Sequence, residues 1–494
     1  MGNLTIWLTP VWVLSVGVTI GAIVLLFGYG ILWLVSRSTA DSVLRLVKES
    51  VLQWISYVVL AFVAFGLLMA PLIGDPQKPH PFWQIVHSLS RLPHVGALEK
   101  VVEIPARTDD AEIPIQFQSE ELQSYSFRSD QDLVIGVERG KAYSNPLIRV
   151  AGGETYVWTP SSKLPRMFAG PVTMLYATNQ SDAPTELTVS IKTDVPLVEV
   201  HQIPLTAAAV IGIYLTYFLI HWLWPGVSTI ALATSKEAVA QPIYLLALLI
   251  GACALLLYIY IPYNTFGEDV KMYKDSGLMT IMILSILVAV WTASVSVAEE
   301  IEGRTALTLL SKPISRREFV LGKFVGIVWA NLLMFVVLGA WMILLVSYKV
   351  VYDARETSNP EPNWQACSAQ MIGTVPGLIL SFMETVVLTA ISVAISTRLP
   401  MLPNLVICGS IYVLGHLGPL IVQSSVGQNE FVAFFGQLIA LILPVLDHFN
   451  VQAAVAGGVR VPIDYLAWAL LYCVLYSAVA MLFALILFED RDLA

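Results

Sequence analysis

Long apolar stretches separated by short polar connections dominate the chain. A helix needs roughly 20 apolar residues to cross a hydrocarbon core of about 30 Å, and nine stretches come near or above that length. They predict nine spans, approximately over residues 9–35, 54–73, 203–224, 242–263, 277–297, 321–347, 371–397, 403–422 and 466–488. The first stretch is far longer than the apolar core of a signal peptide, and no basic residue precedes it. We therefore expect it to be a retained helix.

One more apolar stretch, residues 431–446, is shorter than the nine spans. Glu430 and Asp447 bound it, and its 16 residues are few for a full crossing. A re-entrant or interfacial hairpin fits this length better. A true crossing is the alternative, and it would move the C-terminus to the other side of the membrane.

The pattern changes to short alternating runs between residues 101 and 200. Leu187, Val189 and Ile191 alternate with polar residues, which is the period of a half-buried strand. Similar runs, separated by turn signals such as Gly152-Gly153, cover residues 113–118, 133–138, 155–158 and 172–178. They predict a β-sandwich of about 100 residues, held at both ends by membrane helices.

Basic residues in the short loops predict the orientation, because Lys and Arg stay on the cytoplasmic side. One set of loops holds 11 of them: Arg37, Arg45, Lys48, Lys236, Arg304, Lys312, Arg316, Arg317, Lys323, Arg398 and Arg491. The opposite set holds 5: Lys271, Lys274, Lys349, Arg355 and Arg460. We therefore expect the N-terminus and residues 74–202 to be extracytoplasmic and the C-terminus to be cytoplasmic, in a multi-pass protein of the inner or plasma membrane.

The expected fold is a polytopic α-helical membrane protein, with about nine transmembrane helices and an inserted extracytoplasmic β-sandwich domain. Its predicted parts are two N-terminal helices (1–73), the sandwich domain (74–202), a third helix (203–228) and a six-helix domain (229–494).

Composition narrows the function classes. The 494 residues are 56% hydrophobic and 13% charged, against roughly 25% charged in soluble domains, so a purely soluble protein is excluded. The formal net charge of −9 provides no broad basic surface, and we expect no nucleic-acid partner. The four cysteines form no CxxC pair, so neither a disulfide framework nor a zinc ribbon is expected.

The inserted domain offers no convincing chemistry. His80, His87 and His94 are seven residues apart, a helical rise of about 10.5 Å that is too long for two imidazoles to share one ion. The string GVERGKA at residues 136–142 has three residues between its glycines where a phosphate loop needs four, and Ala follows its Lys. We expect no catalytic residue, no metal and no cofactor bound by this chain, and a recognition or scaffolding role for the sandwich.

The most informative segment is the predicted loop between spans five and six, EEIEGRTALTLLSKPISRREFVLGK at residues 299–323. Its acidic start precedes a short amphipathic helix that ends near Lys312-Pro313, because a residue before proline is pushed out of the helical region. Ser315, with Glu318 three residues later, has the spacing of a capping box for the next helix. A short amphipathic helix in a loop needs a surface on which to bury its leucines.

This segment resembles the signature of type-2 ABC exporter permeases, in which an acidic pair, Gly, Thr and a leucine-rich turn precede Ser, a basic residue and Pro. Ser-Arg and Gly-Lys then lead into the next helix. The matching residues are Glu302, Gly303, Thr305, Leu309, Leu310, Ser311, Lys312, Pro313, Ser315, Arg316, Gly322 and Lys323. Residues 229–242 look like the family's interfacial connector helix, and residues 443–451 and 487–493 look like its last extracellular helix and C-terminal stop. The resemblance covers about residues 229–494, and Arg304 departs from the commoner Gly-Thr form.

The resemblance implies that residues 299–323 dock on a separate ABC ATPase subunit, which would hold ATP and Mg. Leucines would then fill a groove and arginines would meet acidic groups of that subunit. The residues assigned to ATPase coupling are Glu299, Glu300, Glu302, Gly303, Arg304, Thr305, Leu307, Leu309, Leu310, Lys312, Pro313, Arg316 and Arg317. The alternative is a plain turn between helices with solvated charges.

Glu384 lies midway along the seventh predicted span. An ionisable side chain there costs roughly 2.5 to 3.5 kcal/mol on insertion scales, so it faces protein or water. It is either a pathway or gating residue, or one that makes an interhelical hydrogen bond with Ser381, Thr385 or another helix. His221 and His416 are interpreted as packed or interfacial side chains.

The predicted function is that of the membrane-spanning permease subunit of an ATP-driven ABC exporter, working as a homo- or heterodimer, with no ATP-binding site of its own. The sandwich would recognise an extracytoplasmic partner or cargo. The alternative is an ATPase-driven mechanical or signalling complex that moves the outer domain without transporting a substrate. The identity of the substrate lies beyond the sequence.

Overall fold

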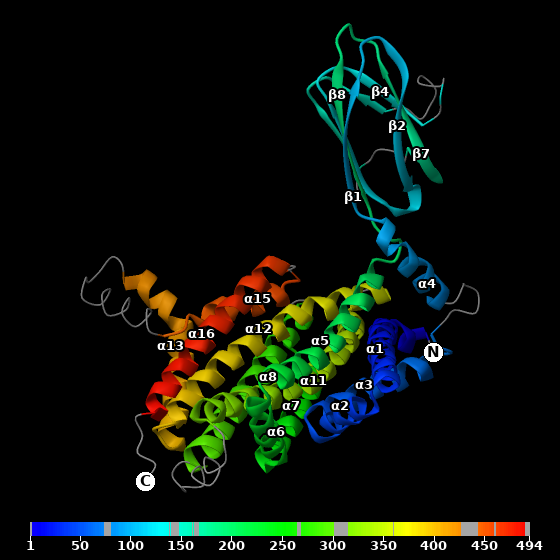
Figure 1. Ribbon diagram of the computed structural model, residues 1–494. Coiled ribbons are helices and arrows are strands. Elements are labelled where there is room, and N and C mark those ends of the chain that lie inside the picture. The colour runs from blue at the N-terminus through cyan, green and yellow to red at the C-terminus, as the bar shows by residue number, and fades with distance from the viewer. Residues whose placement is uncertain are drawn as a thin grey trace. The chain divides into compact units, whose positions relative to one another are not determined.

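The computed structural model describes residues 2–73, 81–137, 139, 148–160, 162, 167–263, 268–300, 315–358, 360–425, 443–458 and 461–489. The chain divides into a helical unit, residues 1–72 with 205–494, and a second unit, residues 73–204 (Figure 1). Of the predicted re-entrant stretch, residues 431–446, the part 431–442 lies outside the described residues.

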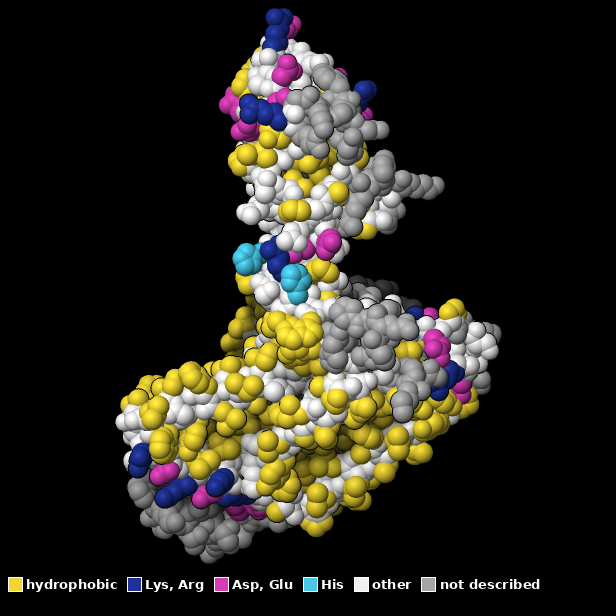
Figure 2. Space-filling model, turned by 90° about the vertical axis from the view of Figure 1, so that its right-hand side faces the viewer, with side chains coloured by type: hydrophobic (Ala, Val, Ile, Leu, Met, Phe, Trp, Pro, Cys, Tyr) yellow, Lys and Arg dark blue, Asp and Glu magenta, His cyan; other side chains and the backbone are white. Residues whose placement is uncertain are grey.

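Hydrophobic runs of membrane-crossing length build the helical unit. Its helices are α1 (Gly2–Val35), α2 (Arg37–Glu49), α3 (Leu52–Met69), α5 (Gln202–Leu223), α6 (Pro225–Ala240), α7 (Pro242–Tyr260), α8 (Asp269–Ala293), α11 (Arg316–Glu356), α12 (Trp364–Ser396), α13 (Met401–Ser425), α15 (Gln452–Ala456) and α16 (Ile463–Glu489). Figure 2 shows hydrophobic side chains over most of one face of this unit, with charged side chains towards its ends. Such a surface fits hydrocarbon and not water.

Eight helices in the described part of the chain are long and apolar enough to span a membrane, where the sequence predicts nine. The ninth, residues 403–422, coincides with α13, in which only the stretch Met401–Leu417 qualifies as a shorter apolar helix. The fold class of a polytopic helical membrane protein with an inserted β domain is confirmed.

Helices α8, α11 and α12 form the centre of the helical unit. Within the apolar segments, 67% of residues in α8 and α12 and 56% in α11 are buried, against 17–28% in α3, α5, α7 and α16. The central helices therefore have few positions left for lipid, and a polar side chain on them meets protein.

The second unit contains two antiparallel four-stranded sheets, ordered β1-β8-β3-β6 and β2-β7-β4-β5. Leu187, Val189 and Ile191 are at most 2% exposed, as their alternation predicts, and pack with Tyr125 and Trp158 in the core between the sheets. The strands are β1 (Ala97–Ile104), β2 (Thr108–Gln118), β3 (Leu122–Ser129), β4 (Leu133–Gly136), β5 (Ile148–Val150), β6 (Thr155–Trp158), β7 (Pro171–Asn179) and β8 (Thr185–Thr193). Helix α4 (Pro81–Arg91) precedes them.

A salt bridge ties α4 to the sandwich. Arg91 donates from Nε and Nη2 to the two carboxylate oxygens of Glu121, at 2.7 and 2.9 Å, and Glu121 is only 3% exposed. The hydrogen bond to Glu121 raises the pKa of the Arg91 guanidinium, which therefore stays protonated. A bidentate pair of this kind fixes both position and angle.

We expect Glu121→Gln to destabilise the sandwich by about 2 kcal/mol, because a neutral amide replaces a buried, charge-assisted acceptor. Proteolysis of the sandwich in the full-length protein during heating measures the change. The matched control is Asp182→Asn, which removes the carboxylate of the exposed pair with Arg107 and should leave the melting temperature unchanged. Equal shifts in the two variants would contradict the structural role of the buried pair.

Candidate functional site

The predicted ATPase-coupling segment is described only at its two ends. Residues 301–314 lie outside the described residues, and so do the predicted positions Glu302, Gly303, Arg304, Thr305, Leu307, Leu309, Leu310, Lys312 and Pro313. Of Glu299 only the backbone is described. The structure therefore shows the helix ends from which the segment leaves and to which it returns, and we call these ends and the helices packed on them its base.

The segment leaves from a π-helix, η4 (Ser294–Glu299), which continues α8. A π turn carries one extra residue per turn and occurs mostly as a short insertion, frequently at functional sites. Hydropathy gives no signal for it, because a one-residue widening leaves the apolar pattern almost intact.

The segment returns at a capped helix start. The Ser315 hydroxyl accepts a hydrogen bond from the backbone N–H of Glu318 at 3.2 Å, while the N–H of Ser315 donates to Glu318 Oε2 at 2.8 Å. The capping box predicted from the spacing is confirmed, and it fixes the direction in which α11 begins.

An ion pair between a buried lysine and a partly exposed glutamate joins the two ends. Lys323 Nζ lies 2.7 Å from Glu300 Oε1, and Lys323 is only 4% exposed. The ammonium also lies 5.7 Å from the centre of the Phe319 ring. Glu300, a predicted coupling residue, thus connects the two ends of the segment within the chain.

The C-terminal helix is fastened to the same base. Arg316 Nη1 donates to the carbonyls of Phe488 and Glu489, at 3.4 and 3.0 Å, and the Phe319 and Phe488 rings stack with centroids 5.7 Å apart. Neighbouring Arg317 is exposed. Arg316 is exposed as well, so the two predicted coupling arginines differ in the contacts that Arg316 makes with α16 and not in exposure.

Helix α6 packs against the first turns of α11 through two glycines. A Cβ added at Gly322 would lie 3.0 Å from the Val227 carbonyl oxygen, and one at Gly326 would lie 2.8 Å from that of Ala231. Small residues permit such close approach of two helices. The base thus includes α6, α11, η4 and the end of α16.

The intramembrane candidate Glu384 lies on α12 and is 1% exposed. Its Oε1 lies 3.5 Å from Nε2 of His416 on α13, and the His416 ring is tilted against Tyr412 at 4.8 Å. The hydroxyl of Thr385, an expected partner, instead donates to its own helix at the Ser381 carbonyl, 2.9 Å away. The sequence shows that Glu384 and His416 are each an ionisable residue within an apolar run, but it does not predict that they are neighbours.

A polar cluster that the sequence analysis missed links α12 and α13 to η4. Asn404 Nδ2 lies 2.8–2.9 Å from the hydroxyls of Ser294, Ser392 and Ser396, and Cys408 donates to its Oδ1 at 3.3 Å. An amide has two N–H groups, so it can serve two of the three hydroxyls at a time. Ser392 and Ser396 lie four residues apart on α12, but Asn404 lies on α13, so a pattern within one helix does not reveal the cluster.

Among the described residues, no group of three or more His, Cys, Asp or Glu is placed to hold a metal ion.

The comparisons with known proteins bear on this arrangement. The family model of the ABC-2 family transporter protein matches residues 166–493, about two thirds of the chain. The match starts before residue 229, where the predicted resemblance begins, and takes in the end of the sandwich and α5. A search of curated proteins finds no significant match.

Proposed function

The chain belongs to the ABC-2 transporter family, whose members are membrane subunits, and from that premise we propose that it is the permease subunit of an ATP-driven exporter. A separate ABC ATPase would bind residues 299–323 and supply ATP hydrolysis with its Mg. The single observation that carries the proposal is the base of this segment. There α11 is joined to the end of η4 by the Lys323–Glu300 pair, to α16 by the Arg316 contacts, and to α6 by close packing at two glycines. A docking segment transmits force only if the helices that hold its two ends move together with it.

The proposed orientation places this base in the cytoplasm. Lys274 and Lys349, which the sequence analysis assigns to loops on the opposite side, are 0% exposed within α8 and α11. Lys323, 4% exposed within α11, leaves the other set on the same ground, so 3 basic residues remain against 10. The bias expected from the positive-inside rule becomes stronger. The sandwich then lies outside the cell membrane, where it would recognise a partner or cargo.

Two copies, identical or related, would complete the transporter. An ATPase pair that closes on ATP would push both copies of residues 299–323. Through α6, α11 and α16 that push would tilt the central helices and alternate the access of a path between the copies. Residues from both copies would line the path.

Purification of the tagged protein from its native membrane in mild detergent tests the proposal. We expect an ATPase with Walker motifs at one copy per chain, and its loss in a Leu309→Asp, Leu310→Asp variant, because two carboxylates cannot enter an apolar groove without a large desolvation cost. The control is Leu402→Asp, at a position 72% exposed on α13, which should keep the ATPase. Retention of the ATPase by the double variant would refute the docking assignment, and a preparation without any ATPase would refute the transporter proposal.

A further inference from the structure

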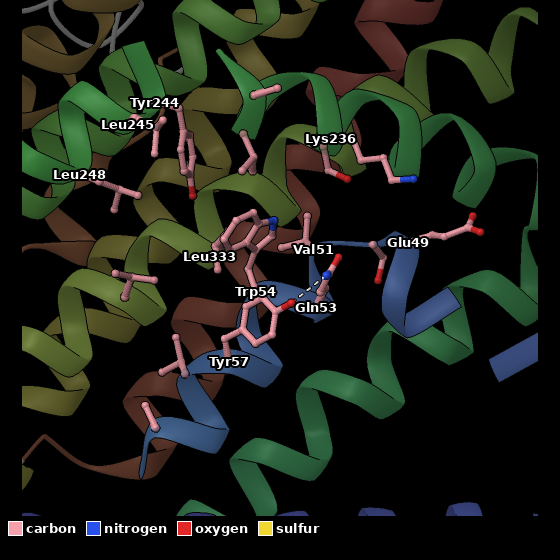
Figure 3. Close-up of a pocket in the computed structure, with 17 residues that line it drawn as sticks. Glu49, Val51, Gln53, Trp54, Tyr57, Lys236, Tyr244, Leu245, Leu248 and Leu333 are labelled. Atoms are coloured by element: carbon pink, nitrogen blue, oxygen red, sulfur yellow. Dashed lines mark hydrogen bonds between the residues drawn. The ribbon is translucent and has the colours of Figure 1, made fainter. Parts of the chain in front are cut away.

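The helical unit has a cavity of about 640 Å³ between its N-terminal helices and α7 (Figure 3). Trp54 and Tyr57 of α3 form one wall, Leu245 and Leu248 of α7 form the other, and Leu333 of α11 lies between them. Because α3 and α7 are among the least buried helices, this cavity faces the hydrocarbon region at the side of the unit.

The cavity continues into a second one, and together they form a groove. The second cavity, about 700 Å³, shares Ala61, Leu245, Leu248 and Val337 with the first. On α3 the groove runs from Trp54 to Phe65 and on α11 from Leu333 to Leu344. Eleven residues of helix rise about 16 Å, close to half of a hydrocarbon core of about 30 Å. The groove therefore has the length of one acyl chain in one leaflet.

The polar side chains of the groove gather at one end. Glu49 and Lys236 lie at the end away from Leu245 and Leu248, and both are exposed (Figure 3). Gln53 lines the same cavity and donates to the Tyr57 hydroxyl at 3.0 Å. Trp and Tyr are enriched at the level of lipid headgroups, which places this end at the membrane surface.

We propose that this groove binds one phospholipid with a zwitterionic, primary-amine headgroup, of the phosphatidylethanolamine class. Lys236 pairs with the phosphate, and Glu49 accepts hydrogen bonds from the ammonium group. One acyl chain lies along Leu248, Val337 and Trp341. The two opposite charges at the mouth select this headgroup over an anionic one, which would leave Glu49 facing negative charge, and over a choline headgroup, which has no N–H to donate.

The site lies next to the proposed coupling base, since Lys236 belongs to α6 and α6 packs against Gly322 and Gly326 of α11. The inference of a bound lipid does not depend on the transport function. It stands on the shape and charge of the groove alone.

Native mass spectrometry of the delipidated full chain, with dioleoyl phosphatidylethanolamine, phosphatidylcholine or phosphatidylglycerol added singly, tests the proposal. We expect one phosphatidylethanolamine to be retained about tenfold better than either other lipid, since one charge-assisted contact accounts for at least that factor. A Glu49→Gln, Lys236→Gln variant should lose this preference. Equal retention of the three lipids by the wild-type protein would overturn the proposal.

A groove-filling variant locates the lipid. Ala61 lines both cavities, so Ala61→Trp should abolish retention, whereas Leu60→Trp, at a position 60% exposed and outside the groove, should not. If Ala61→Trp fails to fold, the Glu49→Gln, Lys236→Gln variant still tests whether the groove selects the headgroup. If Ala61→Trp separates a dimer while lipid retention persists, the groove holds a second copy of the chain and the proposal is wrong.

Discussion

Replacement of Glu300 by glutamine is expected to destabilise the helical unit by about 3 kcal/mol and to reduce the ATPase activity of the assembled complex at least tenfold. Lys323 is 4% exposed, and its ammonium would be left in a buried site without a carboxylate. Removing one partner of a buried ion pair costs more than the pair itself contributes, because the remaining charge stays desolvated. Unfolding in mixed detergent micelles and ATP hydrolysis by the reconstituted complex measure the two effects.

A double-mutant cycle and a contrasting variant separate a structural ion pair from a docking residue. Lys323→Met with Glu300→Gln removes both charges and should recover most of the lost stability, as uncharged replacements of buried pairs often do. Arg317→Met is the contrasting variant, because Arg317 is exposed in the first turn of α11, six residues before Lys323. It should leave the unfolding free energy unchanged while weakening ATPase binding. Additive losses in the double variant would show that Glu300 and Lys323 do not act as a pair.

Local sequence patterns predict an element well where its apolar residues follow one period or where a capping motif marks its start. The alternation at Leu187, Val189 and Ile191 placed β8 in the sandwich core, and the spacing of Ser315 and Glu318 predicted the start of α11. In both cases the controlling interaction lies within a few residues of sequence. The predicted runs leave out three strands, β1, β3 and β5. β1 is mostly exposed, β5 has only three residues, and in β3 the apolar residues Leu122, Tyr125 and Phe127 keep no strict alternation.

Interactions between distant segments could not be predicted in the same way. Glu384 and His416 lie on different helices, and so do Ser294, Ser392 and Asn404, so their proximity depends on the packing of α8, α12 and α13. The apolar pattern predicts that Lys349 lies in a loop, yet α11 extends to Glu356 and buries Lys349, whose Nζ donates to the Ile259 carbonyl at 3.0 Å. Net hydropathy cannot distinguish a charged loop from a long helix whose charged end is covered by protein.

Glu384→Leu is expected to raise the stability of the helical unit by about 1 kcal/mol or more and to abolish ATP-driven turnover. A buried carboxyl in the membrane is costly, so an apolar side chain of similar length lowers that cost. Glu384 is 1% exposed, with His416 at 3.5 Å as its neighbour on another helix. A residue kept in spite of such a cost fits a role in the working cycle, where stability and activity often oppose each other.

The same variant decides between the two interpretations of Glu384. If its carboxyl serves only as an interhelical hydrogen-bond group, Glu384→Leu lowers the melting temperature and turnover per folded complex persists. If it lies on the pathway or gates it, turnover falls at least tenfold while the melting temperature holds or rises. Thr385→Val is the matched control, because that buried hydroxyl bonds only to the Ser381 carbonyl among the contacts described, so both readouts should stay near wild type. In a complex that moves its outer domain without a transport path, Glu384→Leu would spare ATP turnover, so this variant also separates a transporter from a mechanical device.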